Sequence, residues 1–336
     1  MILVTGGLGY IGSHTVVELI NSGKDVVIID DLSNTNINVL ENIEKIVNKK
    51  ILYYNIDLKD KVKLEKVFKE NDITGIIHFA GFKAVGESVD KPIMYYENNL
   101  VTTLNILSLM EKYNVKNIIF SSSATVYGQP KTIPVYEEFD TGYTNPYGGT
   151  KLFIEKILND VALAHKEWGI IILRYFNPIG SHETGLLGEE PNGIPNNIMP
   201  YILKVATGEL SHVNVFGDDY DTVDGTGVRD YIHVVDLAEG HVKALEKLDK
   251  VNGGKYIYNL GTGKGTSVLE LINAFKKASA LDVPYIITER RSGDVDTVFA
   301  NADKAFKELG WKPKYNIDDM CISVYNYYLK KQEGKV

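Results

Sequence analysis

The sequence contains one cysteine, Cys321, and lacks both a long apolar run and a basic leader segment. A single cysteine cannot form an internal disulfide and has no second thiol with which to bind a metal, so a disulfide scaffold is excluded. No stretch approaches the roughly 18 apolar residues of a membrane span, and Met1 leads directly into the strand-like run at 2–4. We therefore expect a cytoplasmic protein that makes no contact with a membrane.

Positive charge is also scarce, because 36 Lys and Arg residues face 44 Asp and Glu residues, for a net charge of −8. Such a chain repels phosphate backbones and anionic lipid at long range, which argues against nucleic acid as a partner. The seven histidines show no His-x-x-x-His or Cys-His spacing, and the acidic stretch at 217–225 does not follow the ligand pattern of a calcium-binding loop. We therefore expect no bound metal.

What is present is a pattern of short β-branched runs alternating with helical stretches over the first half of the 336 residues. Several of the runs are apolar throughout, which is typical of strands buried on both faces of a parallel sheet. The sequence therefore predicts an α/β fold with a doubly wound parallel sheet. The predicted strands cover 2–6, 25–30, 51–57, 75–81, 117–122 and 169–176, and helical periodicity begins at His14, Lys63 and Ile93.

The domain organisation is predicted from a change in texture after Asn177, where loops rich in Gly, Pro and Asn begin. Residues 1–177 are expected to form a Rossmann-like domain, and 178–336 a smaller, mixed α/β domain. A helix followed by a strand within 236–260 still has the doubly wound pattern. We therefore expect that the segment at about 230–262 rejoins the first sheet.

The first motif is the stretch TGGLGYIG at 5–12, which places Gly6, Gly9 and Gly12 between a strand and a helix. Alone, such a triplet also describes an ordinary tight turn, but here the next strand ends in Asp30, where a ribose-binding acid belongs. The helix N-terminus would receive the pyrophosphate. Because a carboxylate repels a 2′-phosphate, Asp30 and Asp31 favour NAD over NADP. Asp57 is open between a helix N-cap and an adenine contact.

The second motif, NPYGGTK at 145–151, predicts a helix capped by Asn145 with Pro146 at its first position. Tyr147 and Lys151 are four residues apart and share one helix face. In an arbitrary chain that spacing usually means a partly buried tyrosine above a solvated lysine. Here, however, the helix follows a strand whose carboxyl end would face the cofactor and which ends near Ser123. For Ser121 and Ser122, a purely structural role as turn residues at the strand end stays an alternative.

These residue types suit proton transfer to and from a substrate hydroxyl. A tyrosine must lose about three units from its ordinary pKa near 10 to act as a base at neutral pH, at a free-energy cost on the order of 4 kcal/mol. A cation about 4 Å away supplies roughly that energy at an effective dielectric constant of about 20, and oxidised nicotinamide adds a second positive charge. Ser123 can share a hydrogen bond with the reacting hydroxyl.

TGGLGYIG, SSSATVYG and PYGGTK together resemble the extended short-chain dehydrogenase/reductase superfamily. The runs at 78–89, 173–180, 193–201 and 224–234 are more specific and look like those of the UDP-glucose 4-epimerase family. The resemblance covers nearly the whole chain. It implies an isomerase that interconverts UDP-galactose and UDP-glucose through a transient 4-keto sugar, with NAD reduced and reoxidised within each turnover. It also implies a homodimer in which two helices of each subunit form the contact. The apolar faces at 93–113 and 147–165 are compatible with such a contact.

The resemblance also implies residue roles. Tyr147, Lys151 and Ser123 would be catalytic. The NAD site would comprise Gly6, Gly9, Tyr10, Ile11, Gly12, Asp30, Asp31, Leu32, Ser33, Asn34, Thr35, Asp57, Leu58, Phe79, Ala80, Gly81, Phe82, Lys83, Asn98, Ser123, Tyr147, Lys151 and Phe176. The UDP-sugar would be held by Lys83, Ser123, Tyr147, Asn177, Asn197, Ile198, Phe216, Arg229, Arg291, Asp294 and Val298.

Two features depart from the family pattern, a pair of glycines and one valine. Gly148 and Gly149 lie in the first turn of the catalytic helix, where each costs up to about 1 kcal/mol relative to alanine, so we expect looser local order. Val298 stands where members restricted to unacetylated sugars tend to have a tyrosine. Additional activity on UDP-N-acetylglucosamine and UDP-N-acetylgalactosamine is therefore a hypothesis.

Other readings give different chemistry to the same fold. Sugar-nucleotide dehydratases of the superfamily have Asp-Glu where this chain has Ala124-Thr125, which disfavours elimination. A different nucleotide-sugar epimerase or dehydrogenase remains an alternative, and so does a non-catalytic dinucleotide-binding module. Such a module has no need of Ser123, Tyr147 and Lys151 together.

Overall fold

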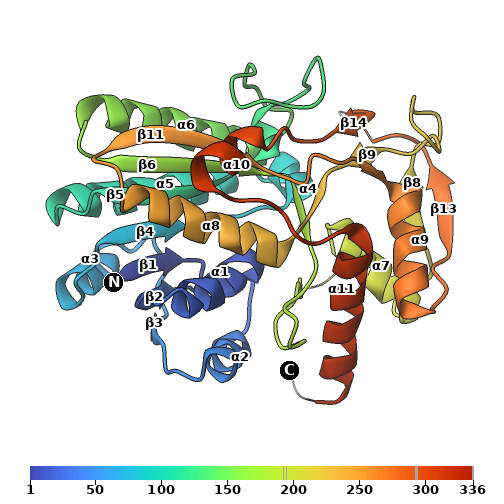
Figure 1. Ribbon diagram of the computed structural model, residues 1–336, viewed down its shortest axis with the longest axis horizontal. Helices are drawn as coiled ribbons and strands as arrows, with labels where there is room; N and C mark the ends of the chain where they lie inside the picture. Colours follow the sequence, from blue (N-terminus) through green and yellow to red (C-terminus); the bar gives the residue numbers. More distant parts are fainter. Residues whose placement is uncertain (192, 194, 292–293, 335–336) are drawn as a thin grey trace.

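The computed structural model describes residues 1–191, 193, 195–291 and 294–334. Its centre is a seven-stranded parallel sheet in the order β11-β6-β5-β4-β1-β2-β3 (Figure 1). The strands are β1 (Ile2–Thr5), β2 (Val26–Ile29), β3 (Leu52–Tyr54), β4 (Gly75–His78), β5 (Asn117–Ser123), β6 (Gly169–Tyr175) and β11 (Gly254–Leu260). Strands β1 to β6 have the spatial order of a doubly wound dinucleotide-binding fold, so the predicted fold class is confirmed.

Helices cover both faces of this sheet. One face packs against α1 (Tyr10–Asn21), α2 (Asn38–Val47), α8 (Val234–Leu248) and α10 (Asp303–Leu309), and the other against α3 (Lys61–Glu70), α5 (Pro92–Lys112) and α6 (Pro146–Ala164). The short α4 (Val85–Asp90) contacts α5 and α6. Successive strand residues alternate between the two apolar cores, so that Val4 belongs to one and Leu3 to the other. Burial on both faces is why these strands read as continuous apolar runs.

Two predicted strands are shorter in the structure by three residues or more. The run at 51–57 forms only β3, and the run at 75–81 ends as β4 at His78. Asp57 does not cap the following helix, because Asp60 does so by accepting a hydrogen bond from the Lys63 amide. The carboxylate of Asp57 instead accepts from the Lys59 amide and closes a local turn.

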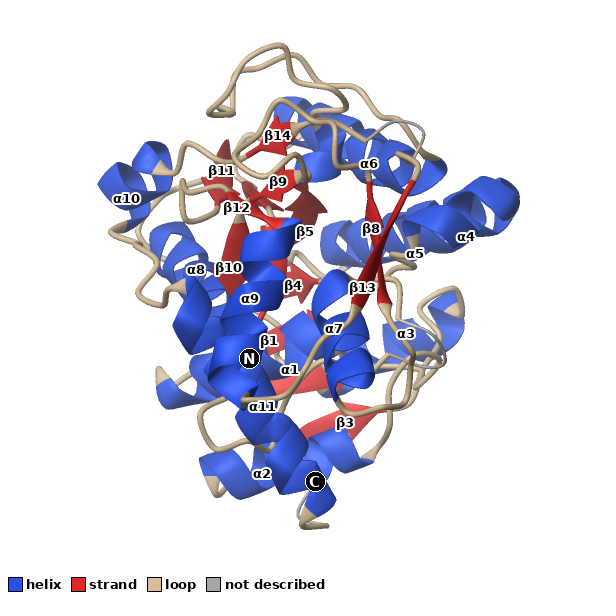
Figure 2. Cartoon of the chain, turned by 90° about the vertical axis from the view of Figure 1, so that its right-hand side faces the viewer, coloured by secondary structure: helices blue, strands red, loops and turns tan. Residues whose placement is uncertain are grey.

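The second half of the chain builds a smaller unit beside the sheet (Figure 2). It contains α7 (Ile198–Ala206), α9 (Val268–Ser279) and α11 (Ile317–Gln332) around a core of their own. Short strands complete it: β7 (Asn177–Ile179) with β10 (Tyr231–His233), β8 (Val213–Phe216) with β13 (Tyr285–Thr288), and β9 (Val228–Arg229) between β12 (Thr266–Ser267) and β14 (Thr297–Val298). Before the chain ends in this unit, β11 returns to the main sheet and pairs along the whole of β6.

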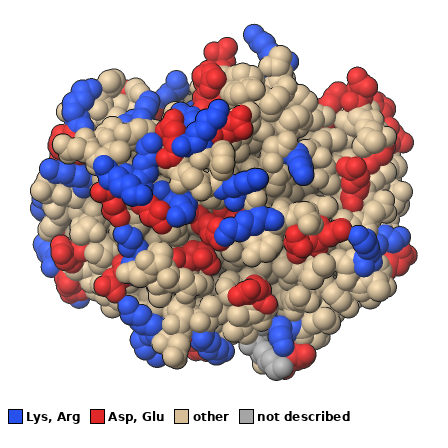
Figure 3. All heavy atoms as spheres, in the orientation of Figure 1, with Lys and Arg blue, Asp and Glu red and all other residues tan. Residues whose placement is uncertain are grey.

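Side-chain chemistry at the surface is mixed. Acidic and basic side chains are interspersed over the face shown in Figure 3. None of the helices in the described ranges is long and apolar enough to cross a membrane. Within the same ranges no cluster of three or more His, Cys, Asp or Glu side chains is placed to hold a metal ion, and Cys321 is buried with a free thiol.

Candidate active site

The carboxyl ends of β1, β2, β4, β5 and β6 meet at one edge of the sheet, and most of the predicted site residues follow them. At the first of these ends, Gly6 has a φ of +67° and lies so close to the next loop that a Cβ would sit 2.8 Å from the Ala80 nitrogen. A Cβ on Gly12 would come within 2.1 Å of the Gly6 carbonyl oxygen. Only glycine allows this turn to pack against its own helix.

The helix after this turn begins without a side-chain cap. Gly9 is the N-cap of α1, and no side chain caps it. The first-turn amides of Tyr10, Ile11 and Gly12 therefore lie at a helix end that has a partial positive charge and no side-chain acceptor. This is the arrangement with which backbone amides bind a pyrophosphate.

The second strand end places an acid beside the turn. The buried Asp30 carboxylate accepts hydrogen bonds from the amides of Leu8 and Leu32, each at 3.0 Å. The pKa of Asp30 is raised, because the effect of burial exceeds the opposite effect of the hydrogen bonds from those amides. Leu32 has a φ of +60°, and Thr35 donates to the Leu8 carbonyl, so the 30–35 loop folds back onto the glycine turn. The Asp31 side chain accepts hydrogen bonds from the amide and hydroxyl of Ser33. Asn34 lies in the same loop, between Ser33 and Thr35.

Other predicted cofactor residues lie farther along the same edge. Leu58 is buried beneath the exposed Asp57, and its carbonyl accepts a hydrogen bond from Asn105 of α5. Phe176 is buried just after β6, where its amide donates to the Leu260 carbonyl. The side chain of Asn98 is half-buried on α5 and donates to Asn99.

The loop from Phe79 to Lys83 is fixed by Asn99, a residue that the sequence analysis did not single out. Its side-chain oxygen accepts from the Phe82 amide at 2.8 Å, and its nitrogen donates to the Phe82 carbonyl at 3.0 Å. The same nitrogen donates to the Thr150 hydroxyl on α6. This buried amide therefore joins the predicted cofactor loop to the helix of Tyr147 and Lys151. Its position next to Asn98 is the only signal in the sequence that pointed to it.

The predicted catalytic residues come together between β5 and α6. The helix begins as predicted, because Asn145 caps it through the Gly148 amide and Pro146 is its first residue. Ser123, at the end of β5, hydrogen-bonds the hydroxyl of Tyr147. Lys151 is 5% exposed, and its ammonium lies 6.0 Å from the centre of the Tyr147 ring and donates to the Ser121 carbonyl at 2.7 Å.

The pKa values in the chain by itself differ from the expectation for a ready base. Burial raises the pKa of Tyr147 to about 12, although the hydrogen bond from Ser123 opposes that rise. Burial lowers the pKa of Lys151 to about 8, against an opposite effect of Glu155. In the chain by itself, burial therefore outweighs the hydrogen bond from Ser123, and the protein groups alone do not lower the pKa of Tyr147 below its ordinary value.

The other two serines of the strand end have buried partners and are not simple turn residues. Ser121 donates to Nε2 of His241 on α8, since Nδ1 of that imidazole donates to the Leu237 carbonyl. Ser122 points to the opposite side of the strand and donates to Glu155 of α6 at 2.6 Å. Both contacts join residues that are far apart in the sequence.

The two glycines of α6 make close packing possible. A Cβ on Gly149 would lie 2.7 Å from the Tyr96 hydroxyl oxygen and 3.2 Å from the Tyr143 ring. A Cβ on Gly148 would lie 3.3 Å from the Thr125 carbonyl oxygen. At both positions the glycines let neighbouring groups approach the first turn of the helix, and looser local order there stays a prediction.

Five of the predicted substrate residues form one group in the smaller unit. Asp294 accepts from the Arg291 Nε at 3.0 Å and lies 3.6 Å from an Arg229 nitrogen. The Arg291 guanidinium stacks over the Phe216 ring at 4.6 Å. Val298 pairs with Arg229 in the β9–β14 ladder and packs against the apolar cluster that contains Phe176. Two arginines beside one carboxylate make a cationic site suited to phosphate oxygens.

A second group joins the two halves of the molecule through Glu189. This carboxylate accepts from Lys83 Nζ at 3.0 Å and from the Asn197 amide nitrogen at 2.6 Å. Asn197 is the N-cap residue of α7, and Ile198 is its first residue. Asn177, the first residue of β7, is exposed and its backbone is paired with Asp230. Lys83 and Asn197, which the sequence analysis treated as separate contacts, thus share a partner that it missed.

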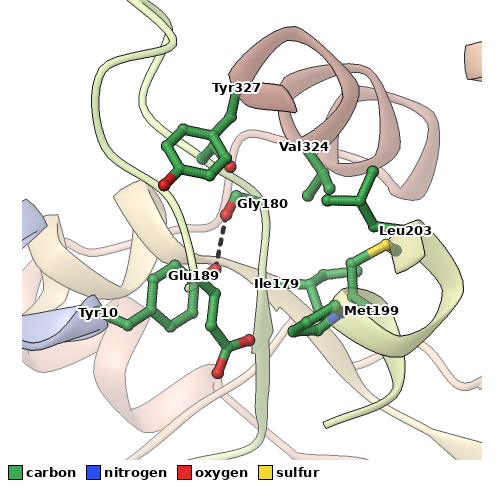
Figure 4. A pocket seen from close by; sticks show the side chains of 10 residues that line it. Tyr10, Ile179, Gly180, Glu189, Met199, Leu203, Val324 and Tyr327 are labelled. Atoms are coloured by element: carbon green, nitrogen blue, oxygen red, sulfur yellow. Dashed lines mark hydrogen bonds between the residues drawn. The ribbon is translucent and has the colours of Figure 1, made fainter. Parts of the chain in front are cut away.

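Tyr10 contributes a further link between the halves. Its hydroxyl donates to the Gly180 carbonyl at 2.6 Å, and Figure 4 shows both residues beside Glu189 at a cavity of about 10 Å³. Burial, followed by the charge of Glu189, raises the Tyr10 pKa well above its ordinary value. The side chain of Tyr10 therefore fastens the glycine turn to the smaller unit, and its contribution to a cofactor would come from its backbone amide.

The residues present fit an NAD molecule. The uncapped end of α1 suits the pyrophosphate, and the buried Asp30 suits a ribose with a free 2′-hydroxyl. Ser123, Tyr147 and Lys151 lie at the carboxyl end of β5, which is where a nicotinamide would be placed in this fold.

Comparison with known proteins gives consistent results. A family model described as GDP-mannose 4,6 dehydratase matches residues 3–324. A relative from Bacillus subtilis described as UDP-glucose 4-epimerase is 55% identical over 99% of this chain and 98% of its own. The solved structure of UDP-glucose 4-epimerase from Bifidobacterium longum in complex with NAD+ and UDP has a TM-score of 0.95 and 55% identity, with 99% of both chains covered. The UDP-Glc/GlcNAc 4-epimerase of Campylobacter jejuni gives a TM-score of 0.85 and 34% identity over 98% of this chain and 99% of the other.

Proposed function

The chain belongs to the GDP-mannose 4,6 dehydratase family, and within it to the UDP-glucose 4-epimerases of the extended short-chain dehydrogenase/reductase superfamily, and from this we propose how its own residues carry out the reaction. It is an NAD-dependent isomerase that interconverts UDP-galactose and UDP-glucose through a transient 4-keto sugar. The observation that carries the proposal is the convergence of Ser123, Tyr147 and Lys151 at the sheet edge that begins with the glycine turn.

In the proposed mechanism Tyr147 takes the proton from the sugar's 4-hydroxyl and later returns it to the same oxygen, after the 4-keto sugar has turned its other face toward the cofactor. NAD, when bound, would supply the acceptor and donor of the C4 hydride and a positive charge. Lys151 holds a second positive charge near the phenol ring, and Ser123 keeps the phenolic oxygen oriented through their hydrogen bond. Because no proton leaves the site, one tyrosine serves as both base and acid.

The alternatives lack a supporting contact. Ala124 and Thr125 form a short 3-10 turn (η1, Ala124–Val126) directly after Ser123, so no carboxylate stands there to remove a neighbouring hydroxyl. A dehydrogenase would need NAD to exchange in each cycle. We propose instead that Asp30, the glycine turn and the 79–83 loop hold NAD through many turnovers.

The first test uses the purified wild-type protein without added cofactor. We expect it to convert UDP-galactose into UDP-glucose, and we expect denaturation of the same preparation to release NAD. Product sugars are separated by anion-exchange chromatography, and the released dinucleotide is quantified enzymatically. Turnover that appears only when NAD is added, together with a lasting absorbance change at 340 nm, would indicate a dehydrogenase.

The division of labour along the chain is also part of the proposal. Residues 1–177 and the returning segment at about 230–262 would bind NAD, and 178–336 would otherwise bind the nucleotide sugar. The pyrophosphate would lie against Arg229 and Arg291, whose guanidinium groups already gather around Asp294. Lys83 and Asn197, which share Glu189 as a partner, would also contact the sugar nucleotide.

We propose further that Val298 allows N-acetylated sugars to bind. The Campylobacter jejuni protein is named as a UDP-Glc/GlcNAc 4-epimerase, so its name includes such a sugar. We expect the wild type to turn over UDP-N-acetylglucosamine. Val298→Tyr should lower that activity by about tenfold to a hundredfold, because the larger side chain fills the space of the acetamide group. Both substrates are assayed with both proteins, so UDP-galactose turnover is the internal control. Wild-type protein that acts on UDP-galactose alone would contradict this proposal.

We also propose a cytoplasmic homodimer formed through α5 and α6, which contact each other on one face of the sheet. Ile93 and Leu104 of α5 are exposed and lie three helical turns apart on one side. We expect sedimentation to give about twice the mass of one chain. Leu104→Glu should shift the protein to a monomer, whereas Val62→Glu on α3, at an equally apolar but separate exposed position, should not. A wild-type monomer at micromolar concentration would exclude the dimer.

A further inference from the structure

A buried network of charged groups lies directly behind the catalytic residues, on the side of β5 that faces α6. Its centre is Glu155, one helical turn after Lys151 on the same helix. One carboxylate oxygen accepts from Ser122 at 2.6 Å and from the Arg174 Nε at 3.0 Å. The other oxygen accepts from the Arg174 Nη2 at 2.6 Å. The ion pair is therefore bidentate, and both side chains are buried.

Further contacts of Arg174 hold the network in place. Arg174 of β6 donates its remaining nitrogen to the Glu137 carbonyl and stacks over the Tyr127 ring at 4.8 Å. The Tyr127 hydroxyl donates to Asn259 of β11 at 2.6 Å. Burial lowers the pKa of Arg174, but the hydrogen bonds and charge of Glu155 raise it above its ordinary range. Glu155 is thus held in one position by partners on two strands.

Two connections lead from this network to the site. Through Ser122, Glu155 holds the residue immediately before Ser123. Through space, its negative charge opposes the burial that lowers the pKa of Lys151. The other titratable groups that face Lys151 carry no negative charge in the chain without cofactor, because burial lowers the pKa of His78 of β4 to about 3 and raises the pKa of Tyr147 of α6 to about 12. Among the described residues, the Ser121 carbonyl of β5 is the one hydrogen-bond acceptor of the ammonium.

We propose that Glu155 is a positioning residue of the epimerase, which keeps Lys151 charged and the Ser121–Ser123 strand end in register with α6, while Arg174 holds the carboxylate in place. The proposal rests on the function proposed above, because it assigns a role to a residue behind that same site. A buried ammonium without a counter-charge releases its proton more easily, so loss of Glu155 should limit activity at alkaline pH.

The test is the pH dependence of kcat for UDP-galactose with NAD-loaded enzyme. In Glu155→Gln we expect the alkaline decline of activity to move about one pH unit toward acid, with kcat recovering as the pH is lowered and KM nearly unchanged. Glu155→Asp keeps the charge and should return the decline most of the way to its wild-type position. Asp160→Asn is the matched control, since it removes an exposed carboxylate from the same helix, and its profile should match the wild type.

Glu155→Gln leaves Arg174 buried without its partner, and that variant could fail to fold. The double variant Glu155→Gln/Arg174→Gln removes both charges and avoids this penalty. Its decline should also lie on the acid side of the wild type, by no more than in the single variant. Activity lowered equally at every pH in these variants, with the decline unmoved, would reduce Glu155 to a structural role and overturn the proposal. Absence of epimerase activity in the wild type would instead refute the proposed function.

Discussion

Replacement of Tyr147 by phenylalanine is expected to lower kcat on the order of a thousandfold while the protein stays folded and retains NAD. The phenolic oxygen is the group that hydrogen-bonds Ser123, so its removal takes away both the proton acceptor and its orientation. General acid–base groups contribute between about a hundredfold and ten-thousandfold, and here a single group works in both directions. The ring itself remains to fill the buried site.

The measurement is kcat and KM for UDP-galactose, together with the NAD content per chain. Tyr136→Phe is the control, because it removes the hydroxyl of an exposed tyrosine outside the site. The variant's NAD content should equal that of the wild type, which separates lost chemistry from a lost cofactor. Inversion at C4 that continues at a rate within a few-fold of the wild type would assign the proton transfer to another group.

Replacement of Gly12 by alanine is expected to abolish NAD retention and, with it, activity without added cofactor. The new methyl group would lie 2.1 Å from the Gly6 carbonyl oxygen and 2.9 Å from the Gly7 Cα, both of which belong to the backbone of the turn. The turn and α1 must therefore move apart, which displaces the amides that would receive the pyrophosphate. Overpacking of this kind costs about 1–3 kcal/mol of folding stability.

Gly86→Ala is the matched control for this change. Gly86 lies on α4 with nothing within 4 Å of its would-be Cβ, so alanine there should be neutral or slightly stabilising. NAD content, measured after denaturation, and the thermal unfolding midpoint are compared for both variants. Full NAD content in Gly12→Ala would mean that the turn adjusts to the methyl group and that the dinucleotide is held elsewhere.

The parts of the molecule that follow from local patterns could be predicted from the sequence. The alternation of buried strands and helices predicted the doubly wound sheet, since residues of one strand must satisfy both faces. The start of α6 was also predictable, because Asn145 and Pro146 have a defined role at a helix N-terminus. Asp57 shows the limit of such reasoning. It and Asp60 are both suitable N-cap residues, and only the backbone path decides between them.

The remaining features depend on contacts between residues that are far apart in the chain. Ser122 and Arg174 meet at Glu155, and Tyr10 reaches Gly180, although no periodicity connects these positions. The pKa of Tyr147 belongs to the same class, because desolvation depends on everything packed around the ring. Sequence motifs thus predicted side chains that the fold brings together, whereas the groups that hold them could be found only in the folded chain.

The return of β11 to the main sheet has a consequence for biosynthesis. Its partner β6 ends at Tyr175, but β11 begins only at Gly254, about 80 residues later. At translation rates of about 5–20 residues per second, the outer edge of β6 stays unpaired for on the order of 4–16 s after its synthesis. An open strand edge of this kind invites aggregation. A nascent chain at this stage is therefore a natural client for chaperones on the ribosome, and a fragment truncated after 177 would leave the same edge permanently unprotected.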